Sequence, residues 1–149
     1  MEFLKKQSIG FYTSVIVVVL TIVSAVLFRS NATNAYYNDP NSTVILLAAV
    51  GVILVVVSIA LAQAADTNPV LDTILALVRV LIPVAIMAAG MVFVTGRVYS
   101  YGIIFGSDLE AGNEAAHSAA VESIVAMGFC AGSAVLAAIT AFFSIKKAE

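Results

Sequence analysis

Uncharged apolar residues form four long runs along the chain, separated by polar segments. Three runs, Ile9 to Phe28, Val44 to Ala62 and Ile124 to Ile145, have close to the 20 or so residues that cross about 30 Å of hydrocarbon as a helix. The remaining run, Val80 to Thr95, reaches this length when the segment from Val70 is added. No run alternates polar and apolar residues as barrel strands do, so only helices can satisfy a spanning backbone. The pattern predicts an all-α membrane protein, a single four-helix transmembrane bundle over residues 1–149 with helices at about 9–28, 43–65, 70–95 and 119–145.

Basic residues predict how these helices are oriented. Lysine pairs stand before the first helix, at residues 5–6, and after the fourth, at residues 146–147. Four crossings place both pairs on one side, and cytoplasmic segments are rich in Lys and Arg, so we expect both termini in the cytoplasm. The outer segments, residues 29–43 and 96–122, then carry two basic and five acidic residues.

The composition agrees with lipid as the surroundings of this chain. Of its 149 residues, 62% are apolar and 11% are charged, against about a quarter charged in soluble domains. The single cysteine, Cys130, excludes a disulfide within the chain and the redox enzymes that need cysteine pairs. We expect a multi-pass protein in contact with the lipid bilayer, in a bacterial cytoplasmic membrane by default, that binds neither nucleic acid nor a cofactor.

Small residues recur every four positions in the fourth helix. Gly128 and Gly132 form a GxxxG pair, and Ala126, Cys130, Ala134 and Ala138 form a second row. Small residues let transmembrane helices approach closely, so we expect both rows to pack within the bundle. The alternative is a seam for self-association, which would make a homo-oligomer, or for binding a partner.

Asp72 and Arg79 are the charged residues of the third helix, two turns apart on one face. We expect a structural pair in which the arginine extends toward the cytoplasmic surface. The alternative is a role in transport, since ionisable residues within membranes often mark functional sites. The middle of each span has no acidic residue, which argues against a proton-driven transporter.

The stretch from Gly106 to Ser123, which leads from the third helix into the fourth, holds four of the nine acidic residues and the only histidine. Ser107-Asp108-Leu109-Glu110 has the form of a capping box, which predicts a short helix. Gly112 should end it, and Asn113 should cap a helix that continues into the fourth span.

Three functional interpretations of this segment are open: a metal site, an enzyme active site and a docking surface. Glu114 and His117 have the i, i+3 spacing of a carboxylate and histidine pair in di-iron sites, but such a site needs a second histidine unit from a partner chain. A simpler metal site that adds Asp108 or Glu110 is the alternative. Acid–base catalysis by His117 lacks a nucleophile with an orienting group beside it, so no enzyme is expected. A docking surface explains the length of the segment and its mixture of aromatic and acidic residues, although these would also suit the lipid headgroup region.

The sequence thus predicts a non-catalytic accessory or scaffolding subunit of a larger membrane protein complex. Its partner would be a transporter or a membrane-anchored enzyme with an extracytoplasmic domain. Candidate interface residues are Tyr99, Tyr101, Phe105, Asp108, Glu110, Glu114 and His117. The alternative is a small homo-oligomeric transporter or channel, with its path lined by Arg79 and the hydroxyls of Thr13, Ser24, Ser58, Thr95 and Ser133.

Overall fold

The computed structural model describes residues 6–64 and 68–146. In this part of the chain every regular element is helical, apart from one isolated antiparallel bridge between Gln7 and Lys146. The all-helical class predicted from the sequence is therefore confirmed. The elements in chain order are α2 (Ile9–Ala32), α3 (Ser42–Ala64), α4 (Pro69–Thr95), α5 (Val98–Gly106), the 3₁₀ segment η2 (Asp108–Glu110) and α6 (Glu114–Thr140).

Four of these helices, α2, α3, α4 and α6, are long and apolar enough to cross a membrane. They contain 24, 23, 27 and 27 residues, and a rise of about 1.5 Å per residue carries each across about 30 Å of hydrocarbon. The chain is an integral, multi-pass membrane protein.

The ends of the spans differ from the predicted ones. Helix α2 continues to Ala32, past its predicted end at Phe28, and α6 begins at Glu114, ahead of the span predicted from 119 but directly after the predicted cap at Asn113. Helix α6 ends at Thr140 rather than at 145, because the chain then turns and the Ser8 amide donates a hydrogen bond to the Ile145 carbonyl at 2.9 Å. The predicted last residue of the second helix, residue 65, lies outside the described residues.

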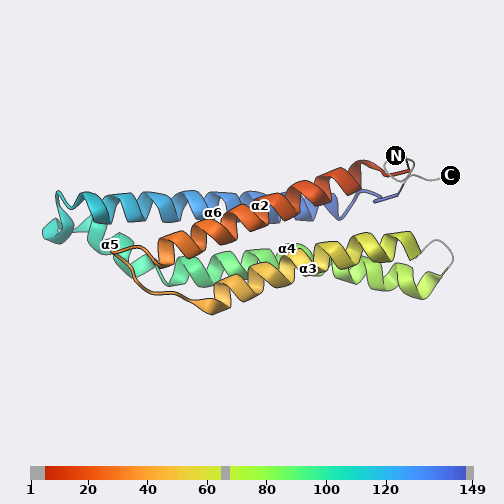
Figure 1. The fold of residues 1–149 in the computed structure, drawn as a ribbon, viewed down its shortest axis with the longest axis horizontal. Coiled ribbons are helices and arrows are strands. Elements are labelled where there is room, and N and C mark those ends of the chain that lie inside the picture. Colours follow the sequence, from red (N-terminus) through yellow and green to blue (C-terminus); the bar gives the residue numbers. More distant parts are fainter. Residues whose placement is uncertain (1–5, 65–67, 147–149) are drawn as a thin grey trace.

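The four long helices form a closed ring in cross-section. Helix α2 lies along α6, and α3 lies along α4, while contacts of α4 with α6 and of α2 with α3 complete the ring (Figure 1). The bridge between residues 7 and 146 marks what we call the terminal end of the bundle. The opposite end, formed by residues 33–41 and 96–113, is called the loop end.

A polar seam joins α2 to α6. The buried residues of α2 recur every three or four positions from Gly10 to Asn31, and those of α6 recur in the same way from Ala116 to Thr140, which is the spacing of packed helix pairs. The seam is defined by four hydrogen bonds: Thr21 Oγ1 with Ser133 Oγ (2.6 Å), Ser133 Oγ to the Val17 carbonyl (3.3 Å), Ser24 Oγ to the Ala126 carbonyl (3.3 Å) and Asn31 Nδ2 to the Ala119 carbonyl (2.8 Å). Such bonds replace the hydrophobic drive that lipid removes.

The small residues of α6 divide between the interior and the surface. Ala126, Cys130 and Ala134 are buried in the core, as the sequence predicted, whereas Ala138, the last member of the predicted row, is exposed and Ala137 is buried instead. Gly128 and Gly132 are exposed, and a Cβ added to either would have no atom within 4 Å. The expectation that this GxxxG pair packs within the bundle is wrong, because the helix rotation that buries the alanine row turns both glycines outward.

Candidate functional site

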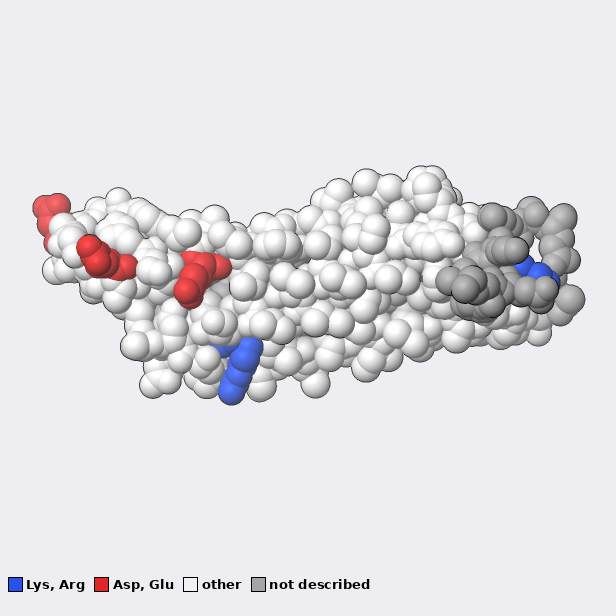
Figure 2. Space-filling view, turned by 45° about the horizontal axis from the view of Figure 1, so that its top comes forward, with Lys and Arg blue, Asp and Glu red and all other residues white. Residues whose placement is uncertain are grey.

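Acidic side chains gather at the loop end, while the long flank of the bundle is largely uncharged (Figure 2). The loop end contains α5 and η2, and the first turns of α6 adjoin it. This end is the first candidate functional site. The second is a small cavity near the terminal end, beside Arg79.

Three local signals shape the loop end. Ser107 Oγ accepts a hydrogen bond from the Leu109 amide at 3.4 Å and donates one to the Ile103 carbonyl at 2.8 Å. It therefore caps η2, so a short helical segment does begin where the sequence predicts one, but it is only a three-residue 3₁₀ turn. The longer helix α5, which the sequence did not predict, ends just before Ser107. Gly112 has a positive φ of 79°, which suits glycine, and breaks the chain direction. Asn113 Oδ1 accepts from the Ala116 amide at 3.2 Å, so the predicted cap of α6 is confirmed.

The carboxylate of Glu110 bonds to Tyr36 and Asn113, in place of the contact that the capping box predicted. It accepts hydrogen bonds from the Tyr36 hydroxyl at 3.3 Å and from the Asn113 side-chain amide. The Tyr36 contact ties the α2–α3 connection to η2. Burial, together with the nearby Glu110 charge, raises the pKa of Tyr36 above its ordinary value of 10.0, because both disfavour the phenolate.

Tyr101 anchors α5 on α6. Its hydroxyl shares a 2.6 Å hydrogen bond with Ser123 Oγ, and both Tyr101 and Tyr36 pack against the buried cluster of Ile104, Ala116 and Ala120. Tyr101 and Glu110, both proposed from the sequence as interface residues, thus also have structural roles within the chain.

Several of the other predicted interface residues are exposed. Tyr99 and Phe105 on α5 have 81% and 55% of their surface exposed. Leu109 on η2, which the sequence did not single out as an interface residue, is 82% exposed. Asp108 and Glu114 are exposed beside them. The loop end therefore presents large apolar side chains and carboxylates together on one ordered structure.

His117 is half-buried, and its ring meets the edge of Phe105 at a centroid distance of 5.8 Å. Glu114, one turn earlier, is exposed in the first turn of α6. Within residues 6–64 and 68–146, no group of three or more His, Cys, Asp or Glu side chains is arranged to hold a metal ion. The structure thus does not bring further ligands to the Glu114 and His117 pair.

Arg97 forms a buried node at the loop end that the sequence did not reveal. Only 4% of its surface is exposed, and its Nε donates to Asn31 Oδ1 at 3.2 Å. Its guanidinium lies 3.9 Å from the centre of the Tyr37 ring and 3.7 Å from Asp39, which is 70% exposed. Because Asn31 also belongs to the polar seam, this node connects α2, α6 and the start of α5.

Sequence reasoning placed Arg97 among the exposed charges of an outer segment. Its position directly after Gly96, at the end of α4, gives no signal of burial. The sequence does indicate that Asn31, the hydrogen-bond partner of Arg97, is buried. It belongs to a row of polar residues at helical spacing on one face of an otherwise apolar run, namely Ser14, Thr21, Ser24 and Asn31. Such a row predicts polar contacts between helices.

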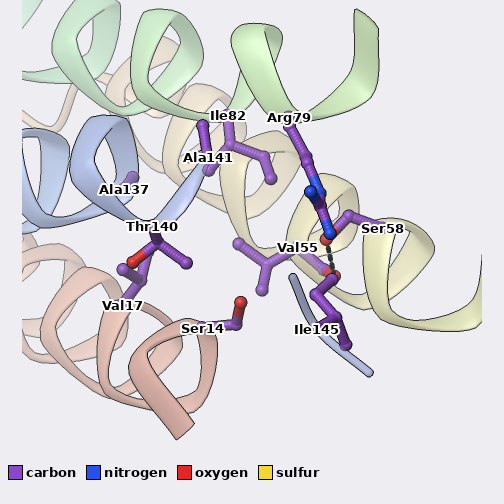
Figure 3. A pocket seen from close by; sticks show the side chains of 10 residues that line it. All are labelled: Ser14, Val17, Val55, Ser58, Arg79, Ile82, Ala137, Thr140, Ala141 and Ile145. Atoms are coloured by element: carbon purple, nitrogen blue, oxygen red, sulfur yellow. Dashed lines mark hydrogen bonds between the residues drawn. The ribbon is translucent and has the colours of Figure 1, made fainter. Parts of the chain in front are cut away.

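Arg79 points from α4 into the bundle, toward Ser58 of α3 and Ile145 of the C-terminal segment (Figure 3). These residues line a cavity of about 10 Å³, together with Ser14 and Thr140. Such a volume is close to the minimum for one water molecule. Asp72 is exposed, and no direct ion pair joins it to Arg79 among the described residues, so the pairing of these two charges stays a prediction.

Comparisons with protein-family models, with curated proteins and with solved structures find no match for this chain. The function therefore has to be argued from the two ends of the bundle. The loop end offers an ordered surface with exposed apolar and acidic groups. The cavity at the terminal end offers one guanidinium and a few hydroxyl groups in a very small volume.

Proposed function

We propose that this protein is a non-catalytic accessory or scaffolding subunit of a larger membrane complex, and that it binds its partner through the loop end. The partner is a transporter or a membrane-anchored enzyme whose working domain lies on the same side of the membrane. The observation that carries the proposal is the presentation of Leu109, 82% exposed, on a capped turn between two acidic residues.

The chemistry of the loop end suits a protein partner. Exposed Leu109, Tyr99 and Phe105 would lose contact with water on binding, and aromatic residues are enriched at interfaces. Carboxylates beside them, at Asp108 and Glu114, would favour a partner surface that carries lysine or arginine. We expect these charges to guide association and the apolar side chains to supply most of the affinity.

The hydrogen bonds between the helices also support a scaffold. The polar seam fixes α2 against α6, and the Arg97 node fixes the loop end to both helices. The cavity that contains Arg79 is only about 10 Å³, which leaves no room for a solute in this conformation. A subunit of this kind holds a partner in place without large internal movement.

The orientation predicted from the lysine pairs, with both termini in the cytoplasm, puts the loop end on the extracytoplasmic side. A membrane-anchored enzyme with an outer domain would then reach it directly. Cysteine labelling of a Glu114→Cys variant in intact cells tests this orientation, after the native Cys130 is changed to alanine. Labelling only after the cells are opened would contradict it.

Purification in a mild detergent, followed by mass spectrometry, tests the main proposal. We expect a second polypeptide at fixed stoichiometry. Leu109→Ser should weaken its retention about thirty-fold, since a central apolar contact contributes about 2 kcal/mol. The matched control is Phe142→Ser near the terminal end, where the side chain is 89% exposed and retention should be unchanged. Absence of a second polypeptide, or equal loss in both variants, would refute the proposal.

A second candidate is a small homo-oligomeric transporter or channel. The observation that favours it is the gathering of Arg79, Ser58, Ser14 and Thr140 around one cavity, where the buried Thr140 hydroxyl has no hydrogen-bond partner among the residues that the structure describes. Solute flux into vesicles that contain this protein alone, abolished by Arg79→Ala, would favour the transporter. An accessory subunit should give no flux, and Arg79→Ala should leave the activity of the complex mostly intact.

A further inference from the structure

A long apolar groove runs between α2 and α3, the adjacent helices with the fewest contacts in the ring. Its volume is about 620 Å³, which is within the range of about 300–1,000 Å³ typical of ligand sites. It is open on the side that faces lipid. Its walls are formed by Thr21, Ile22, Ala25, Val26 and Arg29 of α2 and by Ile45, Ala48, Ala49, Val52 and Ile53 of α3.

The groove covers the depth of one lipid leaflet. It begins near the middle of both helices, at Thr21 and Ile53, and ends at Arg29 and Ile45 near the loop end. The eight residue steps from 21 to 29, at about 1.5 Å each, make about 12 Å, and half of a hydrocarbon core of about 30 Å is about 15 Å. A ligand in this groove would therefore lie parallel to the acyl chains of a single leaflet.

The walls of the groove are suited to an acyl chain. Alanine at positions 25, 48 and 49 leaves space where larger side chains would fill it. Thr21 adds little polarity, because its hydroxyl bonds to the Val17 carbonyl at 2.8 Å and to Ser133 at 2.6 Å. A hydrocarbon chain would meet few unsatisfied polar groups along this path.

The mouth of the groove is basic. Arg29 is exposed in the last turn of α2 and forms no ion pair in the part of the chain that the structure describes. The acid nearby, Asp39, is paired with Arg97. Helix α3 begins at Ser42, close to the same mouth, and its N-terminus adds partial positive charge. Charge at headgroup depth therefore favours a phosphate.

We propose that the groove binds one acyl chain of an anionic phospholipid from the leaflet at the loop end, with the lipid phosphate on the Arg29 guanidinium. The site is separate from the loop-end surface used in the proposed function. Lipid binding at this site requires an apolar groove of leaflet depth and a cation at its mouth. Helices α2 and α3 form the groove, and Arg29 is the cation.

The absence of tryptophan in this chain provides a direct test. A single reporter, Val26→Trp, stands at the rim of the groove, and Met91→Trp on α4 is its matched control, since the two native side chains are 62% and 65% exposed. Each reporter protein is placed in phosphatidylcholine vesicles with a small fixed fraction of chain-brominated phosphatidylglycerol or chain-brominated phosphatidylcholine. Bromine quenches the fluorescence of a tryptophan that it touches.

We expect brominated phosphatidylglycerol to quench the Val26→Trp reporter selectively, with a relative association constant about five-fold above that of phosphatidylcholine, since one basic residue near the surface contributes about 1 kcal/mol. The Met91→Trp control should show no such preference. Adding Arg29→Gln should remove the preference, and adding Arg29→Lys should keep it. Adding Ala49→Phe, which fills the groove, should lower quenching by both lipids, whereas Ala60→Phe on the exposed face of α3 should not.

Two results would overturn the proposal. Equal selectivity at the two reporters would mean that the groove holds ordinary bulk lipid. Protection of the Val26→Trp reporter from both brominated lipids, while the Met91→Trp control is quenched, would mean that a protein segment or a second copy of this chain covers the groove.

Discussion

Replacement of Arg97 by methionine tests the buried node at the loop end. The change removes the hydrogen bond from Nε to Asn31 Oδ1, and a bond from a charged group contributes about 1.5–3 kcal/mol. The stacking of the guanidinium on Tyr37 at 3.9 Å adds about 1–2 kcal/mol when it is shielded from water. Asp39 is 70% exposed, so its ion pair adds less than about 1 kcal/mol.

These contributions are partly offset, because methionine fills most of the volume and removes the desolvation of a buried charge. We expect Arg97→Met to lower the free energy of unfolding by about 2–4 kcal/mol. Asp39→Ala should lower it by less than about 1 kcal/mol. The assay is unfolding by sodium dodecyl sulfate in mixed micelles, followed as loss of helical circular dichroism.

A double-mutant cycle with Asn31→Leu then isolates the contact between the two side chains. Residues that share one hydrogen bond should show a coupling energy of about 1–3 kcal/mol. Equal effects of Arg97→Met and Asp39→Ala, or additive effects in the cycle, would refute the reasoning that Arg97 is a buried structural cation.

Three further predictions use the same unfolding assay or a simple titration. In the polar seam, Thr21→Val and Ser133→Ala should each lower the free energy of unfolding by about 0.5–1.5 kcal/mol, and the double variant should be hardly worse, because the two share one bond; full additivity would contradict this. Gly10→Ala should destabilise by about 1–3 kcal/mol because its Cβ would lie 2.5 Å from the Ser144 carbonyl oxygen, whereas Gly128→Ala should be neutral or stabilising in the monomer. Tyr36 has a raised pKa, so its contribution to stability should be constant below about pH 10 and decline as pH rises through the folded pKa. Absorbance titration of the phenolate should show the pKa of Tyr36 fall in Glu110→Gln, and an unchanged curve would contradict the assigned cause.

The number of spans could be predicted from the sequence because the length of an apolar run directly reflects the thickness of the bilayer. The cap at Asn113 could also be predicted, since a cap needs only a side chain and its nearest backbone amides, and it forms. The capping box at Ser107 and Glu110 was predicted less well, because Tyr36, from a distant part of the chain, competes for the carboxylate.

The candidate site could be predicted less well than the spans, because it depends on contacts between residues that are far apart in the sequence. Small-residue spacing in α6 indicated two rows, but which row faces inward depends on helix rotation, which is set by all the neighbours together. The burial of Arg97 could not be predicted, because its partners Asn31, Tyr37 and Asp39 are about 60 residues away in the chain. The accessory role and the orientation of the termini remain predictions.

The polar seam connects the first long helix to the last, which has a consequence for how the protein is made. When the ribosome has released α2, its partner carbonyls and the Ser133 hydroxyl on α6 have not yet been synthesised. Asn31 in particular must wait at the membrane surface or in lipid without the Ala119 carbonyl. Assembly of the bundle can therefore finish only after α6 inserts, and a chain interrupted before that point would carry an unpaired carboxamide that membrane quality control can recognise.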